Sequence, residues 1–215
     1  MPDFATLIPD ARAFLGQLAE NNNKAWWEDN KATYVSQLKT PALALIDEVS
    51  TQLAAMTDLP VKGKLFRPHR DVRFSKDKTP YKTHLHMLWT AQTGARQDVA
   101  FFFGIGLDDV RAGGGVMGFE KDVLADWRLF VDQDHKRILK ITNGLRDKGF
   151  GFWEPALKRV PSPFDKDHPA AELLRMKGCV AFKDLKPGKS LARDLDATFQ
   201  DFWPLNQLLI QIVEA

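Results

Sequence analysis

The first sixty residues carry apolar side chains at helical spacing. This pattern predicts one helix over 9–20 and a second over about 24–39, separated by three asparagines that suit a helix end and the cap of the next helix. A third helix is expected to begin at Pro41, because its apolar residues then step by four and three positions as far as Met56. Leu59–Pro60 is expected to end this helical region.

The middle of the chain has the two-residue period of a strand. Residues 84–90 and 99–107 both have an apolar side chain at every second position, as half-buried strands do. Asp108–Asp109 is expected to form a two-residue turn, after which the chain returns over 110–117. So short a connection predicts antiparallel pairing.

Helical spacing returns over about 120–148 and again over 190–203, where Pro204 is expected to break or kink the last helix. The segment between them is rich in proline over 150–169, which predicts a loop, and residues 170–177 are expected to form a short helix.

Together these elements predict a single α+β domain over residues 1–215. Its centre is a mainly antiparallel sheet, built from about 70–117 plus an edge strand near 179–183. N-terminal, middle and C-terminal helices pack on this sheet. The same periods predict eight buried core residues, which are Ile46, Val49, Leu53, Phe101, Phe103, Ile105, Trp127 and Phe130.

Composition narrows the class of protein without naming a partner. The 215 residues are 44% hydrophobic and 27% charged, which is typical of a globular domain, and the formal net charge is only +2. The single cysteine, Cys179, excludes a disulfide framework. No apolar run has the length of a membrane span, and the N-terminus lacks the features of a secretory signal, so we expect a soluble cytoplasmic protein without a membrane partner.

One segment departs from this charge balance. Residues 62–84 hold eight lysines and arginines but only two acidic residues, Asp71 and Asp77, so the remainder of the chain is net acidic. Such an asymmetry is typical of a site for an anionic ligand. Arginine grips phosphate or carboxylate through two parallel N–H groups, and the hydroxyls of Ser75, Thr79 and Tyr81 add further donors.

The same segment has a local pattern of its own. Alternation over 70–75 predicts a short strand that turns at Lys76–Asp77 and re-enters the sheet near Lys82. Pro80 favours an extended conformation at Thr79, so the end of the segment is expected to be rigid.

Our first hypothesis is a site for a small phosphorylated or carboxylated molecule, and the residues leave open whether a reaction follows binding. If it does, one of the two aspartates is the candidate base, and Tyr81 or a lysine the candidate acid. The residues identify no cofactor. The expected ligand-binding residues are Arg67, Arg70, Asp71, Arg73, Ser75, Lys76, Asp77, Lys78, Tyr81 and Lys82.

Two alternatives use the same segment. Nucleic acid, less favoured as a partner at this low net charge, would place phosphates on the cations and stack bases on Phe66 or Tyr81. In a non-enzymatic structural or partner-binding domain, the two aspartates would instead pair with the arginines as a buried ion-pair brace.

Three other sequence features, a glycine run, a pair of histidines and the single cysteine, are expected to have structural roles and not functional ones. Residues 113–118 have the glycine spacing of a dinucleotide site, but a predicted antiparallel strand precedes them, so we expect glycines that let another backbone or a ligand approach. His84 and His86 share one strand face without a third ligand, and no metal site is expected. Cys179 lies in an apolar strand and is expected to pack in the core.

The segment RDVRFSKDKTPYKTH, with NNNKAWWEDNKATY before it and DHPAAELLRMKG after it, resembles the bacterial and fungal domain of unknown function numbered 2461. The resemblance covers nearly the whole chain and implies one domain, but it supplies no activity, substrate or catalytic residue. It implies that the family pattern includes Trp27, Arg70, Asp71, Arg73, Ser75, Lys76, Asp77, Lys78, Pro80, Tyr81 and Lys82.

Overall fold

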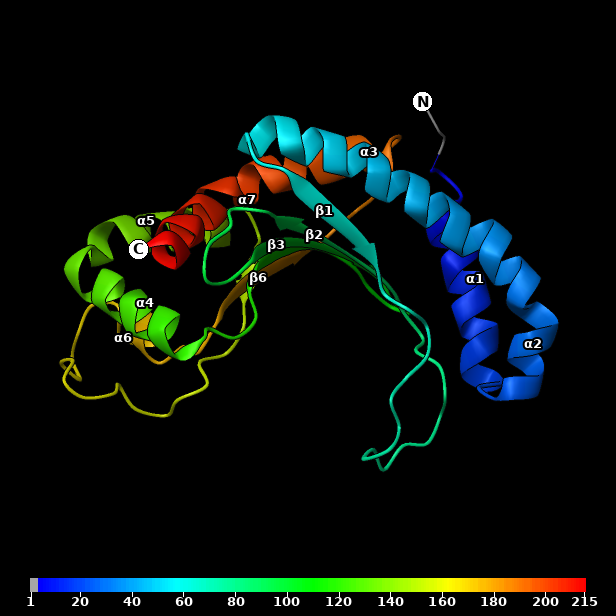
Figure 1. Cartoon of the computed structure of the whole chain (residues 1–215), viewed down its shortest axis with the longest axis horizontal. Coiled ribbons are helices and arrows are strands. Elements are labelled where there is room, and N and C mark those ends of the chain that lie inside the picture. The colour runs from blue at the N-terminus through cyan, green and yellow to red at the C-terminus, as the bar shows by residue number, and fades with distance from the viewer. Residues whose placement is uncertain (1–3) are drawn as a thin grey trace.

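A six-stranded antiparallel sheet lies at the centre of the protein in its computed structural model, which describes residues 4–215 (Figure 1). The strand order across the sheet is β1-β2-β3-β4-β6-β5. The predicted α+β class and antiparallel sheet are confirmed. The strands are β1 (Val61–Leu65), β2 (Leu85–Ala91), β3 (Val99–Ile105), β4 (Val110–Val116), β5 (Gly151–Phe152) and β6 (Cys179–Asp184).

The helices cover one face of this sheet and its ends. They are α1 (Leu7–Glu20), α2 (Lys24–Thr33), α3 (Thr40–Thr57), α4 (Lys121–Gln133), α5 (His135–Asp147), α6 (Ala171–Leu174) and α7 (Leu191–Glu214), with a π-helical stretch, η1 (Tyr34–Lys39), between α2 and α3. α3 contacts β1 and β2, and α7 contacts β3 and β4. Both helices run along the outer side of the arched sheet, so its inner, concave side is left without a helix across its middle (Figure 1).

The core lies between the sheet and these helices. Trp89 on β2 is fully buried, and its indole N–H donates to the Ile46 carbonyl of α3 at 3.1 Å. Seven of the eight predicted core residues are buried, which confirms the faces assigned to the helices and strands. The prediction was wrong for Phe130, which packs against the core from α4 but stays partly exposed.

The sheet differs from the prediction at three places. β1 is an additional edge strand in which Gly63 takes a core-facing position, because a Cβ there would lie 2.2 Å from the Ile46 Cγ2 atom. Residues 70–75 form no strand and are joined to the chain beside them through a single bridge between His69 and Tyr81. β6 is not an edge strand, because β5 pairs along its outer side.

Two helices also differ from the prediction. The segment 120–148 forms two helices, because Asp134 leaves helical geometry (φ −126°, ψ 38°) and ends α4 where α5 begins. α7 continues through Pro204 to Glu214. Leu205, Leu208 and Leu209 are fully buried beyond that proline, so tertiary packing outweighs the lost backbone hydrogen bond.

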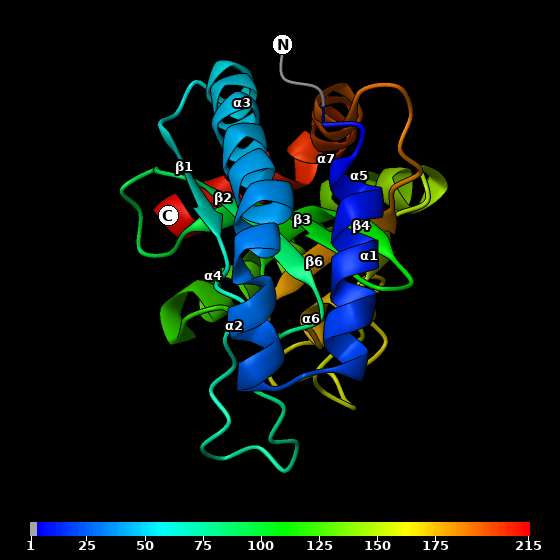
Figure 2. The same ribbon diagram turned by 90° about the vertical axis from the view of Figure 1, so that its right-hand side faces the viewer.

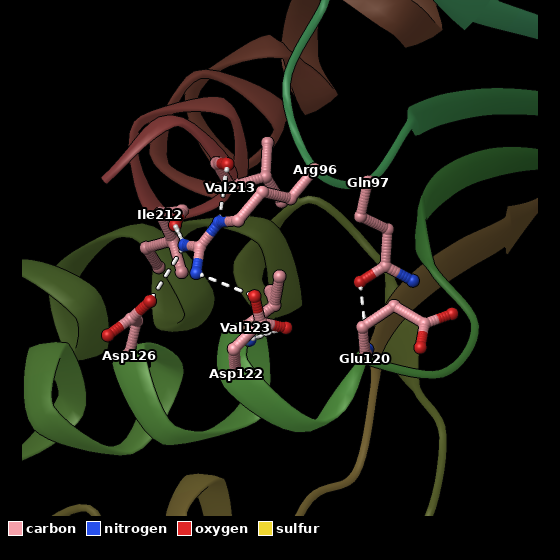
Figure 3. A network of polar contacts seen from close by, with 8 residues as sticks. All are labelled: Arg96, Gln97, Glu120, Asp122, Val123, Asp126, Ile212 and Val213. Atoms are coloured by element: carbon pink, nitrogen blue, oxygen red, sulfur yellow. Dashed lines mark hydrogen bonds and ion pairs between the residues drawn. The ribbon is translucent and has the colours of Figure 1, made fainter.

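Arg96 in the β2–β3 loop fastens this loop to two helices (Figure 3). Its guanidinium pairs with Asp122 at 3.0 Å and Asp126 at 2.7 Å on α4, and it donates to the carbonyls of Ile212 and Val213 near the end of α7. The loop residue that follows, Gln97, accepts from the Glu120 N–H at 3.0 Å. These contacts fix the β2–β3 loop against α4 and α7.

Among the described residues, the structure contains no helix of the length and apolarity that crossing a membrane requires.

Candidate functional site

The concave side of the sheet forms a groove of about 1010 Å³. Its lining comes from four strands, β2, β3, β4 and β6. On β2, Met87 and Trp89 point into the core while their neighbours point into the groove. The groove-lining residues of these strands include His86, Leu88, Thr90, Ala100, Phe102, Val180 and Phe182.

The predicted binding segment stands at one end of this groove. Residues 66–84, which we call the basic arm, leave the sheet after β1, extend away from the body and return into β2 (Figures 1 and 2). Figure 2 shows the arm projecting beyond the ends of α1 and α2. The expectation of a short strand here fails because the tip of the arm has no neighbouring strand to pair with.

The base of the arm is fixed by buried and backbone contacts. Tyr81 is buried, and its ring stacks on Trp27 of α2 with 4.4 Å between the ring centroids. The side chain of Asn22 accepts from the Tyr81 N–H at 3.0 Å and donates to the Tyr81 carbonyl at 2.9 Å. Two backbone bonds of 2.8 Å, from Arg70 to Pro80 and from Lys82 to Pro68, hold the two sides of the arm together.

The tip of the arm is held by ion pairs at the surface. Arg70 donates to Asp77 and to the Thr79 hydroxyl. Hydrogen bonds from the Thr79 N–H and from Arg70 lower the pKa of Asp77 to about 2. Arg73 pairs with Asp71 at 2.6 Å, and this hydrogen bond lowers the pKa of the Asp71 carboxyl. These pairs are the ones expected of a brace, but they are exposed to solvent and not buried.

The ten predicted ligand-binding residues therefore do not surround one cavity. Lys82 lines the groove, and the other nine do not. Tyr81 is buried in the base of the arm, and Arg70 and Ser75 are partly exposed. The remaining six, Arg67, Asp71, Arg73, Lys76, Asp77 and Lys78, are exposed along the arm.

His84 and His86 form the most unusual feature of the groove. Their rings are stacked with centroids 3.8 Å apart, and His86 also meets the Phe102 ring edge-to-face at 5.0 Å. Neither imidazole makes a hydrogen bond to another described residue. The sequence indicated that the two side chains share a face, but not that they lie side by side in a cavity.

Burial governs the charge of these two histidines. Burial, together with the charges of His84 and Lys82, lowers the pKa of His86 to about 4. Burial also lowers the pKa of His84, and Lys82 acts in the same direction, whereas Asp109 opposes it. Both rings are therefore neutral near pH 7, and each offers one N–H donor and one nitrogen acceptor to the groove.

Three lysines lie on the groove side of the sheet, and one of them, Lys82, lines the groove beside these histidines. The Lys64 ammonium lies 5.0 Å from the centroid of the Phe66 ring, and the Lys82 ammonium lies 5.7 Å from the same centroid. Lys62 and Lys64 on β1 pair in register with Thr90 and Leu88, which face the groove, so these lysines lie on the same side of the sheet.

The carboxylates around Arg111 are partly neutralised, and one of them, Asp109, lies close enough to His84 to act on its pKa. The Arg111 guanidinium lies 3.1 Å from both Asp109 and Asp184, and it covers the Phe182 ring at 5.1 Å. The three lysines are therefore the source of uncompensated positive charge beside the groove. Among the described residues, no three histidine, cysteine or acidic side chains come together as metal ligands.

The glycine run lies in β4 and has a structural explanation. A Cβ at Gly114 would lie 2.2 Å from the Ala100 carbonyl oxygen, and one at Gly115 would lie 2.0 Å from the Cys179 oxygen. The expected close approach of neighbouring backbones is confirmed. Cys179 is fully buried, which raises the pKa of its thiol to about 12.

Comparison with known families identifies the family of the chain. The model of a family described as a conserved hypothetical protein, DUF2461, matches residues 10–211. The chain belongs to the DUF2461 family. The match begins within α1 and ends within α7, so the basic arm and the groove both fall inside the DUF2461 region. The chain matches none of the curated proteins and none of the solved structures with which it was compared.

Proposed function

We propose that the protein binds a small molecule bearing a phosphate or carboxylate group in the groove, with that group beside Lys82, His84 and His86. The observation that carries this proposal is the pair of stacked imidazoles without hydrogen-bond partners among the described residues. Both residues line the groove, so their ring nitrogens are available to a ligand bound there.

Size and charge support the same assignment. A groove of about 1010 Å³ lies at the upper end of the range of about 300–1,000 Å³ that is usual for small-molecule sites. Lys82 supplies a positive charge without an acidic partner among the described residues, whereas Arg70 and Arg73 on the arm already pair with aspartates. Lys82 is thus the arm cation best placed to meet an anion in the groove.

Lysine and histidine side chains contribute to binding in different ways. Lys82 attracts the anionic group through its charge, and a neutral imidazole donates a hydrogen bond from its N–H. A bound anion also favours the protonated form of a histidine, so ligand binding is expected to raise the pKa of His86 from its low value.

Thermal melts with phosphate, simple carboxylates and nucleotides, each against chloride at matched ionic strength, test the proposal. We expect stabilisation of the native protein that is lost in Lys82→Ala and kept in Lys78→Ala, a matched control because Lys78 lies on the arm outside the groove. Histidine signals in NMR should show an increase in the His86 pKa with the stabilising anion. Absence of stabilisation by every anion, or equal loss in both variants, overturns the proposal.

A second candidate function is supported by the tip of the arm. Phe74 is 96% exposed and lies 5.9 Å from the Arg73 guanidinium, among the exposed cations Arg67, Lys76 and Lys78. An exposed ring among cations suits stacking on a nucleic acid base with phosphates alongside. Fluorescence anisotropy with a labelled single-stranded oligonucleotide tests this candidate: binding should weaken with salt and in Phe74→Ala, and binding that Phe74→Ala leaves unchanged would exclude it.

A further inference from the structure

Phe102 and Phe182 face the groove on either side of β4, in one row with the buried Gly113. Phe102 on β3 is in register with Gly113 on β4, and Gly113 is in register with Phe182 on β6. Both phenylalanine side chains line the groove. The strand between them has no side chain at this position. The Phe102 ring leans along β3 toward His86, because a Cβ at Gly104 would lie 2.7 Å from its Cζ atom.

The spacing of the two phenylalanine backbones follows from sheet geometry. Neighbouring strands lie about 4.8 Å apart, so the backbones of Phe102 and Phe182 are separated by about 10 Å. Their rings make no contact with each other. Aromatic rings that interact have centroids about 4.5–7 Å apart, so a backbone separation of about 10 Å is wide enough for one further ring to contact both side chains.

The two rings are supported on the side that faces the arm. His86 meets Phe102 edge-to-face at 5.0 Å, and the Arg111 guanidinium covers Phe182 at 5.1 Å. On the far side, the next row is Ala100, Gly115 and Val180, which are small and also line the groove. The rings are therefore held from one side, and the space between them opens toward small side chains.

We propose that the ligand of the groove carries a flat aromatic ring, which lies between Phe102 and Phe182, and that a short link joins this ring to its anionic group. The inference rests on the proposed function, because the anionic group is the one assigned to Lys82 and the two histidines. His86 lies one groove-facing position along the sheet from this row, so ring and anion are separated by about 7 Å. The ligand class is an aryl or nucleoside phosphate or the corresponding carboxylate.

Calorimetric titration with phenyl phosphate, butyl phosphate and inorganic phosphate separates the contribution of the aromatic ring to the affinity from that of the charged group. We expect phenyl phosphate to bind the wild-type protein roughly tenfold more tightly than butyl phosphate, because stacking adds to apolar contact. Phe102→Leu and Phe182→Leu keep apolar volume and should remove this preference. Phe130→Leu on α4, the matched control outside the groove, should keep it.

A second measurement does not depend on variants. Trp153 lines the groove, so its fluorescence, assigned by comparison with Trp153→Phe, should change with phenyl phosphate and less with butyl phosphate. Equal binding and equal fluorescence change for the two esters would overturn the ring inference while leaving the anion site standing. Absence of binding by all three phosphates would overturn both, and loss of binding only in Lys82→Ala would identify the anion site alone.

Discussion

The indole of Trp27 lies nearly parallel to the phenol of Tyr81, with 15° between their planes and 4.4 Å between their centroids. This contact joins α2 to the base of the basic arm, far away in sequence. Asn22, just before α2, bonds both the N–H and the carbonyl of Tyr81. The N-terminal helices therefore set the direction in which Lys82 enters the groove.

Replacing Tyr81 by leucine should loosen the arm without unfolding the sheet. The stack with Trp27 is expected to contribute about 0.5–1.5 kcal/mol beyond burial, measured as the coupling energy between Trp27→Leu and Tyr81→Leu. Hydrogen exchange of the Arg70 and Lys82 amides, which donate across the arm, should accelerate in both single variants. Unchanged exchange at these amides would show that the backbone bonds alone hold the arm.

Phe103→Ala should lower the free energy of unfolding by about 3–5 kcal/mol, as truncation of a large core side chain does. Phe103 is fully buried at the middle of β3. Phe74→Ala is the control, since its ring is exposed and the change should stay within about 0.5 kcal/mol. Urea titration of both variants checks the prediction, and a loss below about 1 kcal/mol in Phe103→Ala would contradict it.

The strands that the sequence predicted correctly are those whose burial follows the period of their apolar residues. β3 is one of them: its alternate apolar residues Val99, Phe101, Phe103 and Ile105 are all buried. The sequence did not predict β1, because its central residue, Gly63, faces the core without a side chain. Ile46 fills the space that a side chain would take. The opposite error occurred in the arm, where a strand was predicted and none forms. Val72 and Phe74 alternate with polar residues, as in a half-buried strand, but Phe74 is exposed to solvent.

The groove could be predicted only in part. The segment containing Lys82 and the common face of His84 and His86 are visible in the sequence, since both depend on neighbouring residues. The row from Phe102 through Gly113 to Phe182 depends on the register of three strands, and β6 is separated from β4 by three helices, β5 and a long loop. Spacing along the chain carries no information on such a register.

Gly115→Ala should destabilise the protein by more than an ordinary glycine substitution. Gly115 has φ of +118°, and a Cβ would lie 2.0 Å from the Cys179 carbonyl oxygen, so backbone strain adds to a clash with β6. Gly16→Ala in α1 should instead stabilise by about 0.5–1 kcal/mol, because nothing lies within 4 Å of the added atom. Thermal melts of the two variants should therefore shift in opposite directions. An unchanged or higher melting temperature in Gly115→Ala would contradict the strand geometry there.

The free energy of unfolding should depend on pH through His86. Burial, with the charges of His84 and Lys82, lowers its pKa to about 4, whereas an unfolded histidine has a pKa of about 6.5. Between these two values the unfolded chain binds a proton that the folded chain does not. The contribution of the neutral ring is therefore fully present above about pH 6.5 and is lost as the pH falls toward 4.

Comparison of the wild-type protein with His86→Gln isolates this contribution, because glutamine is polar but does not titrate. Urea unfolding at about pH 7.5, 5.5 and 4.5 should show a smaller loss of stability in His86→Gln over this range. Asp77, whose pKa is lowered to about 2, loses its contribution below about pH 4 and so does not mask the effect. Parallel curves for the two proteins would mean that His86 is protonated as easily in the folded chain as in the unfolded one, which its burial between His84 and Phe102 argues against.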